Sequence, residues 1–121
     1  MGLDMYAYKT LEAVEQPVDF KVSDAELIQQ WWKHPNLHGW MEMLYRSKGG
    51  NGNDFNCNPV LLDREDLNRL EADILSKVLP VTEGFFFGET DGSEIEDDLV
   101  FIENARGAIL EGYQVFYDSW W

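Results

Sequence analysis

The sequence has little that would support a disulfide, a metal site or a membrane span. Cys57 is the single cysteine, so no internal disulfide can form and no cysteine pair points to zinc. No run approaches the roughly 18 apolar residues that cross a bilayer. The first residues carry neither a secretory nor a myristoylation signal. We therefore expect a cytoplasmic protein without a bound metal or cofactor.

Basic residues are also scarce. Lysine and arginine number 9 against 23 aspartates and glutamates, which gives a net charge of −14. Surfaces that bind nucleic acid or anionic lipid need positive potential, so the charge argues against both as direct partners. At 121 residues, 45% of them hydrophobic and 14% aromatic, the chain suits one packed domain over residues 1–121.

Apolar periodicity and breakers predict an α+β fold. Strands are expected over 3–8, 55–62, 84–88 and 113–120, and helices over 24–34, 37–48, 63–79 and 94–111. Capping boxes beginning at Ser23 and Ser93 support two of the helix starts, Asp63 is the expected N-cap of the helix over 63–79, and Gly112 suits the end of the last helix. We expect three or four strands in a mixed or antiparallel sheet, with about four helices in a single layer on one face. Residues 85–117 could form a right-handed parallel unit.

Acidic side chains concentrate near the second capping box. Six carboxylates fall within residues 89–98, namely Glu89, Asp91, Glu94, Glu96, Asp97 and Asp98. Negative charge suits a helix N-terminus, so a solvated helix start is one interpretation. A cation site is a second, although the spacing does not match a calcium loop. The third is an acidic docking surface that occupies the basic groove of a nucleic-acid-binding protein.

A second segment combines aromatic and basic side chains. Its candidate contact residues are Trp31, Trp32, Lys33, His34, His38, Arg46 and Lys48. Tryptophan and arginine are typical of interface hot spots. Helical spacing also suits a core, so we expect Trp40 and one of Trp31 and Trp32 to be buried, with the other exposed. Pro35 separates the histidines, which favours packing or capping roles over metal binding.

A small-molecule site is the alternative. Asp4, His38, Arg46 and Asp118, with Lys48 nearby, could line a pocket for an anionic ligand. The glycine-rich residues 49–54 lack the ending of a phosphate-binding loop. We interpret Cys57 as an inert core thiol. No spacing requires a catalytic role, so the sequence favours a protein that is not an enzyme.

Several motifs are similar to those of a small protein family met mainly in bacteriophage genomes, including marine and cyanobacterial phages. The matching stretches are MGLDMY at 1–6, HPNLHGWM at 34–41, YRSKGG at 45–50, GFFFG at 84–88 and YDSWW at 117–121. Some similar proteins carry the label phosphoglycerate kinase, which one domain without a phosphate-binding motif contradicts. The resemblance implies a phage setting and no mechanism.

Charge, aromatic content and this setting together indicate a phage accessory protein that binds a host macromolecule. The expected partner is a host protein with a basic surface, such as a defence factor or a nucleic-acid-binding protein held by nucleic-acid mimicry. A homodimer that buries exposed aromatic side chains is a further expectation.

Overall fold

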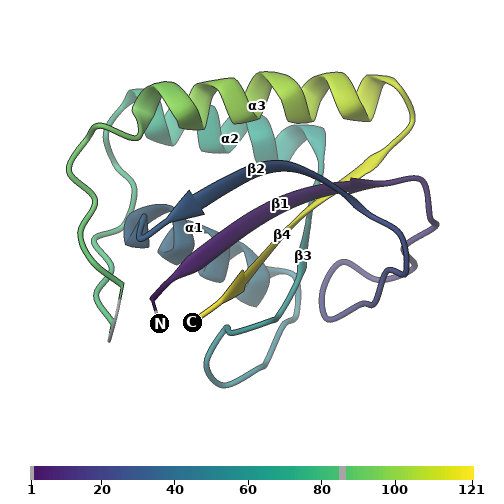
Figure 1. Ribbon diagram of the computed structural model, residues 1–121, viewed down its shortest axis with the longest axis horizontal. Helices are drawn as coiled ribbons and strands as arrows, with labels where there is room; N and C mark the ends of the chain where they lie inside the picture. The colour runs from purple at the N-terminus through teal and green to yellow at the C-terminus, as the bar shows by residue number, and fades with distance from the viewer. Residues whose placement is uncertain (1, 85–86) are drawn as a thin grey trace.

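The computed structural model describes residues 2–84 and 87–121 and confirms the α+β class (Figure 1). Four strands form one antiparallel sheet in the order β2-β1-β4-β3. Three helices were found in the described residues, where about four were expected. In chain order, the elements are β1 (Asp4–Thr10), β2 (Glu26–Trp32), α1 (Pro35–Ser47), β3 (Val60–Leu62), α2 (Arg64–Leu75), α3 (Ile95–Leu110) and β4 (Gln114–Trp120).

The helices lie on one face of the sheet, as expected (Figure 1). Met5 pairs with Trp31 across β2, and Ala7 pairs with Tyr117 across β4, so alternation points these side chains the same way. Trp31 packs against Phe101 of α3, and α1 contacts Tyr117 through its histidine. We call this side the covered face. The opposite side, which β1 lines with Asp4, Tyr6 and Tyr8, is the open face.

The helix predicted over 24–34 is wrong, because β2 occupies Glu26–Trp32 and pairs with β1. The Ser23 capping box does not form. Instead, the Glu12 carboxylate accepts hydrogen bonds from the Ser23 hydroxyl and from the backbone N–H groups of Ser23 and Asp24. The Glu26 carboxylate forms an ion pair with Lys9 on β1. Cross-strand pairing thus overrides the local helix signal.

Two predicted strands also change. The strand expected over 55–62 shrinks to β3, since Phe55 and Cys57 take positive φ values of 45° and 60° that strands do not allow. The strand expected over 84–88 includes residues 85 and 86, which lie outside the described residues, and its other residues join no strand. The parallel unit over 85–117 is wrong for the described part, where every paired strand is antiparallel.

Local signals at the remaining helix ends gave mixed results. Asp63 caps α2 through a capping box with Asp66, which confirms the predicted helix start, but α2 ends at Leu75 and not at residue 79. Gly112 follows α3 with φ of +96°, which confirms the predicted C-terminal glycine. The Ser93 box is wrong: the Ser93 hydroxyl donates to Asp91, and no side chain caps α3.

Candidate functional site

The covered face holds a buried polar network around Asp98. One carboxylate oxygen lies 2.8 Å from His34 Nε2, and the other accepts the indole N–H of Trp31 at 2.9 Å. The side chains of His34 and Asp98 are each 2% exposed. Trp31, His34 and Asp98 therefore belong to no exposed surface, which corrects their assignment to the two predicted binding segments. A buried carboxylate needs such partners, which explains why the two segments meet here.

Thr90 extends this network to the surface. Its Oγ1 lies 2.9 Å from His34 Nδ1, so Thr90, His34 and Asp98 follow each other like nucleophile, base and orienting acid. The surroundings oppose that chemistry. Backbone N–H groups of Asp91 and Gly92 already donate to the Glu94 carboxylate, where an oxyanion would need them free. The arrangement is better explained as a structural contact that links Thr90 to the start of α1.

His38 is buried on the covered face among aromatic rings. Its Nδ1 lies 2.7 Å from the Tyr117 hydroxyl, and its ring contacts Phe55 and Phe87. Burial lowers the pKa of His38 to about 4, so the imidazole is neutral near pH 7. His38 therefore corrects two expectations, since it is neither an exposed contact nor a cationic ligand group. Its role in packing agrees with the sequence.

The predicted anion pocket does not assemble. Arg46 pairs with Glu42 on α1 at 3.1 Å, and Lys48 is held by Asp66 and a backbone carbonyl. Asp4 and Asp118 lie on the open face, on the other side of the sheet from His38. The four residues proposed for this pocket thus point in different directions, because the sequence pattern could not show which face each strand residue takes.

The acidic segment is largely exposed apart from Asp98. Glu89, Glu96 and Asp97 face solvent around the start of α3, and Asp91 and Glu94 accept hydrogen bonds within their own turn. The bond from Ser93 lowers the pKa of Asp91. These carboxylates keep the helix start solvated and negatively charged. Among the remaining members of the aromatic-basic segment, Trp32 and Arg46 are exposed, and Lys33 and Lys48 are partly buried.

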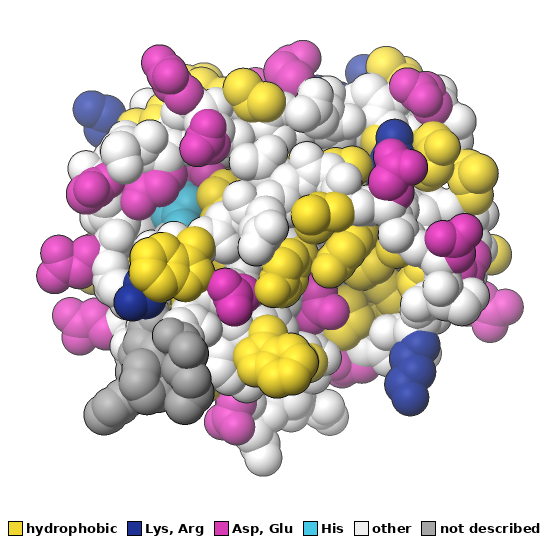
Figure 2. Space-filling model, viewed as in Figure 1, with side chains coloured by type: hydrophobic (Ala, Val, Ile, Leu, Met, Phe, Trp, Pro, Cys, Tyr) yellow, Lys and Arg dark blue, Asp and Glu magenta, His cyan; other side chains and the backbone are white. Residues whose placement is uncertain are grey.

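The open face combines exposed aromatic rings with carboxylates in register. Asp4 stands directly between Trp32 on β2 and Trp120 on β4, which are 63% and 68% exposed. In the next row, Tyr6 pairs with Asp118. Figure 2 shows apolar side chains in several places on the face viewed, with acidic side chains between them. Paired residues have side chains roughly 5 Å apart, so these groups form one surface.

A groove deepens one end of the open face. Residues 11–25 leave β1, run beside β3 through a bridge between Val18 and Val60, and return to β2. Phe20 in this loop packs edge-on against Phe116 with ring centroids 5.2 Å apart. The hollow measures about 630 Å³, and its lining includes Tyr8, Asp19, Phe20, Lys21, Phe116 and Asp118.

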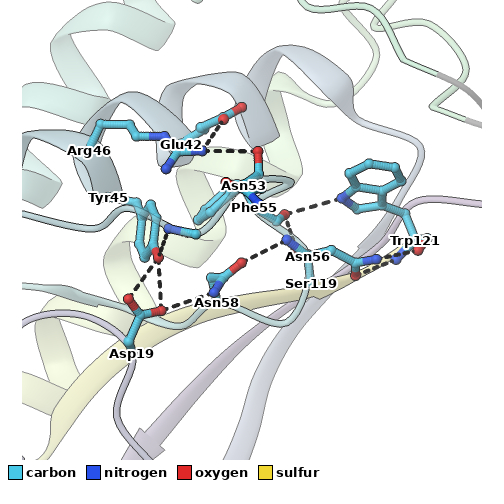
Figure 3. Close-up of polar contacts among 11 residues, drawn as sticks. Asp19, Glu42, Tyr45, Arg46, Asn53, Phe55, Asn56, Asn58, Ser119 and Trp121 are labelled. Atoms are coloured by element: carbon cyan, nitrogen blue, oxygen red, sulfur yellow. Dashed lines mark hydrogen bonds and ion pairs between the residues drawn. The ribbon is translucent and has the colours of Figure 1, made fainter.

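The two groove carboxylates differ in their partners. Asp19 accepts hydrogen bonds from the Tyr45 hydroxyl and the Asn58 amide (Figure 3). Asp118 accepts one, from the backbone N–H of Ser119 at 2.8 Å. Burial raises the pKa of Asp118, with the Ser119 bond partly opposing the shift. Within the described residues, neither Asp118 nor Asp4 forms an ion pair.

Cys57 also lines the groove, which corrects the expectation of an inert core thiol. The Cys57 thiol forms no disulfide and is exposed, whereas Phe55, two residues earlier, is buried in the core. Burial and then the Asp118 charge raise the pKa of the Cys57 thiol. The alternation of Asp4, Tyr6 and Tyr8 with Met5 and Ala7 was the one sequence signal of the open face.

In residues 2–84 and 87–121, no three histidine, cysteine, aspartate or glutamate side chains are placed to share a metal ion. No helix in this part of the chain is long and apolar enough to cross a membrane. Comparison with protein-family models, with curated proteins and with solved structures gave no match.

Proposed function

We propose that this protein binds a macromolecule with a basic surface and that it does so through the open face of its sheet. The observation that carries the proposal is the placement of Asp4 and Asp118, carboxylates without a cationic partner in the described residues, among exposed aromatic rings. The net charge of −14 adds long-range attraction toward such a partner.

Lysine and arginine side chains suit this surface chemically. Their charge is attracted both to carboxylates and to the faces of aromatic rings, and an aromatic ring also covers the apolar stem. The chain provides an internal example, since Lys33 places its Nζ 4.4 Å from the centroid of the Trp32 ring. An anionic partner would meet uncompensated negative charge instead.

The resemblance to phage proteins supports a host protein as the partner. Host nucleic-acid-binding proteins and defence factors that act on nucleic acid present basic grooves, and an acidic protein competes for such a groove by the same electrostatics. In this proposal the open face supplies contacts and the exposed carboxylates of residues 89–98 raise the association rate. The protein inhibits its partner by occupying the partner's basic groove, without catalysis.

A comparison of two double variants tests the proposal. Asp4→Asn with Asp118→Asn and Glu96→Gln with Asp97→Asn each remove two negative charges, the first from the open face and the second from the acidic segment. Host proteins retained by the immobilised wild type at 50 mM NaCl and released at 500 mM NaCl are identified, and the affinity of each purified partner is measured. We expect at least tenfold weaker binding for the open-face pair and less than threefold for the other.

Equal losses in the two double variants would contradict the open face as the contact surface. Retention that does not respond to salt would contradict an electrostatic partner altogether.

Self-association is the competing use of the exposed rings. Trp32 and Trp120 could bury each other across a two-fold axis. That arrangement would also bring the carboxylates of two open faces together without cations, which disfavours it. Light scattering decides: a monomer at 100 µM agrees with the proposed binding face, and a stable dimer that Trp32→Ala disrupts would assign this face to dimerisation.

A further inference from the structure

We propose that the groove on the open face admits one lysine or arginine side chain from a basic segment of the partner, with Asp118 as its counter-ion and the rings of Tyr8 and Phe116 as its floor. This inference rests on the proposed function and specifies where the central contact is made. It assigns the hollow under the 11–25 loop to a ligand of defined charge and shape.

The shape of the groove fits a long side chain. Tyr8 and Phe116 stack with ring centroids 5.3 Å apart, and Phe20 meets Phe116 edge-on, so three rings surround the space. The hollow of about 630 Å³ accommodates a lysine or arginine side chain together with part of its backbone. Aliphatic stems pack well on such rings while their charged ends reach a polar group.

The charge inside the groove selects a cation. Asp118 has one oxygen bonded to the backbone N–H of Ser119 and no described hydrogen bond to the other. Asp19 is occupied by the Tyr45 hydroxyl and the Asn58 amide, and Lys21 contributes the one positive charge of the lining. Two carboxylates and one ammonium leave a single negative charge, which matches one incoming cation.

The half-buried state of Asp118 supports the same conclusion. Partial burial of Asp118 without a cationic partner in the described residues disfavours its ionised form, and this burial raises the pKa of the carboxyl group. A bound cation relieves this disadvantage, so binding and ionisation of Asp118 are linked. Affinity for the cation is therefore expected to fall as the pH is lowered through the pKa of Asp118.

Short peptides test the groove directly. The probes are acetyl-Gly-Gly-Arg-Gly-Gly-amide, its lysine analogue, and a citrulline analogue that keeps the shape of arginine without its charge. Binding is measured at 20 mM NaCl and pH 7 by NMR titration of the full chain. We expect the arginine and lysine peptides to bind at least tenfold more tightly than the citrulline peptide, with shifts at Tyr8, Phe116 and Asp118.

Variants identify the counter-ion. Asp118→Asn is expected to weaken binding of the arginine peptide at least tenfold, whereas Glu111→Gln, which removes an exposed charge after α3, changes it less than twofold. Phe20→Ala, on the exposed loop, is a second test if Asp118→Asn does not fold, with an expected loss of about fivefold. In the wild type, bound peptide should also slow alkylation of Cys57 at least threefold, because this thiol lines the groove.

Equal binding of the arginine and citrulline peptides, or unchanged binding in Asp118→Asn, would overturn the inference. These outcomes are separable from failure of the proposed function. A host partner that still requires the open face, while Asp118→Asn binds the arginine peptide normally, would refute the groove alone. Peptide binding without any basic partner would refute the proposed function and leave the groove as a cation site.

Discussion

The two faces of the sheet carry the same kinds of side chain, which are buried on the covered face and accessible on the open face. Trp31 and Trp32 are neighbours in β2, yet Trp31 is 5% exposed and donates its indole N–H to Asp98, whereas Trp32 is 63% exposed. In β4, Tyr117 is buried against His38, and the next residue, Asp118, faces the groove. Alternation along each strand separates these pairs.

The difference lies in how the carboxylates are satisfied. Asp98 on the covered face has both oxygens bonded to buried partners, so its role is to hold β2, α1 and α3 together. Asp118 on the open face keeps one oxygen without a described partner and a raised pKa. Polar groups that stabilise a fold are paired within it, whereas binding groups remain available at some expense of stability.

The tryptophan pair gives the largest expected contrast. Trp31→Ala should lower the free energy of unfolding by about 3 to 5 kcal/mol, because it leaves a cavity beside Phe101 and removes a hydrogen bond to Asp98. Trp32→Ala should change it by less than about 1 kcal/mol, as expected for an exposed position. Urea unfolding measures both, and similar losses in the two variants would refute the division between the faces.

Replacing Asp98 or Asp118 with the isosteric asparagine tests the same difference between the covered face and the open face. Asp98→Asn should destabilise the protein by about 3 kcal/mol, since it disrupts a buried pair with His34. Asp118→Asn should leave stability at pH 7 within about 0.5 kcal/mol of the wild type or above it. The sign follows from its raised pKa, because an ionised Asp118 disfavours the folded state. A destabilised Asp118→Asn protein would make this residue structural.

His38, on the covered face, makes the stability of the protein depend on pH. Because the pKa of His38 falls from 6.5 in the unfolded chain to about 4 in the fold, the unfolded state binds more protons between these values. The contribution of His38 is complete above pH 6.5 and declines as the pH falls toward 4, by about 2 kcal/mol between pH 7 and pH 5. NMR titration of the ring checks this, and a pKa near 6.5 would contradict its burial.

The smallest expected effect is on the open face, at Cys57. Burial and the charge of Asp118 raise the pKa of this thiol, so its reaction with iodoacetamide at pH 8 should be slower than that of free cysteine. Asp118→Asn should speed the reaction about twofold, while Glu111→Gln leaves it unchanged. An identical rate in all three proteins would place the thiol beyond the influence of Asp118.

Local signals predicted much of the fold. The cap at Asp63, the stop at Gly112 and the apolar stripe of α1 each depend on neighbouring residues, and each element is present. The strand at Glu26–Trp32 could not be predicted in the same way. The capping box at Ser23 does not form because the Ser23 hydroxyl donates to Glu12, eleven residues earlier. The pairing of β2 with β1 is also nonlocal.

The candidate site was harder to predict than the fold. The expectation that one of Trp31 and Trp32 is buried and the other exposed is confirmed, although it was derived for a helix and holds for a strand. Trp32, Asp4 and Trp120 lie side by side because of the register of three strands, and this register could not be predicted from the sequence alone. The acidic segment can be recognised in the sequence because its residues are contiguous, whereas the open face is assembled from residues that are distant in the chain.

Mapping where a basic ligand binds on the folded protein tests directly whether the open face is the binding surface. Backbone and side-chain NMR shifts would be followed while an arginine-rich peptide of about ten residues is added at 50 mM NaCl. We expect the largest shifts on the open face, at Tyr6, Tyr8, Trp32, Phe116 and Asp118. Shifts confined to residues 89–98, with the open face unchanged, would contradict this expectation.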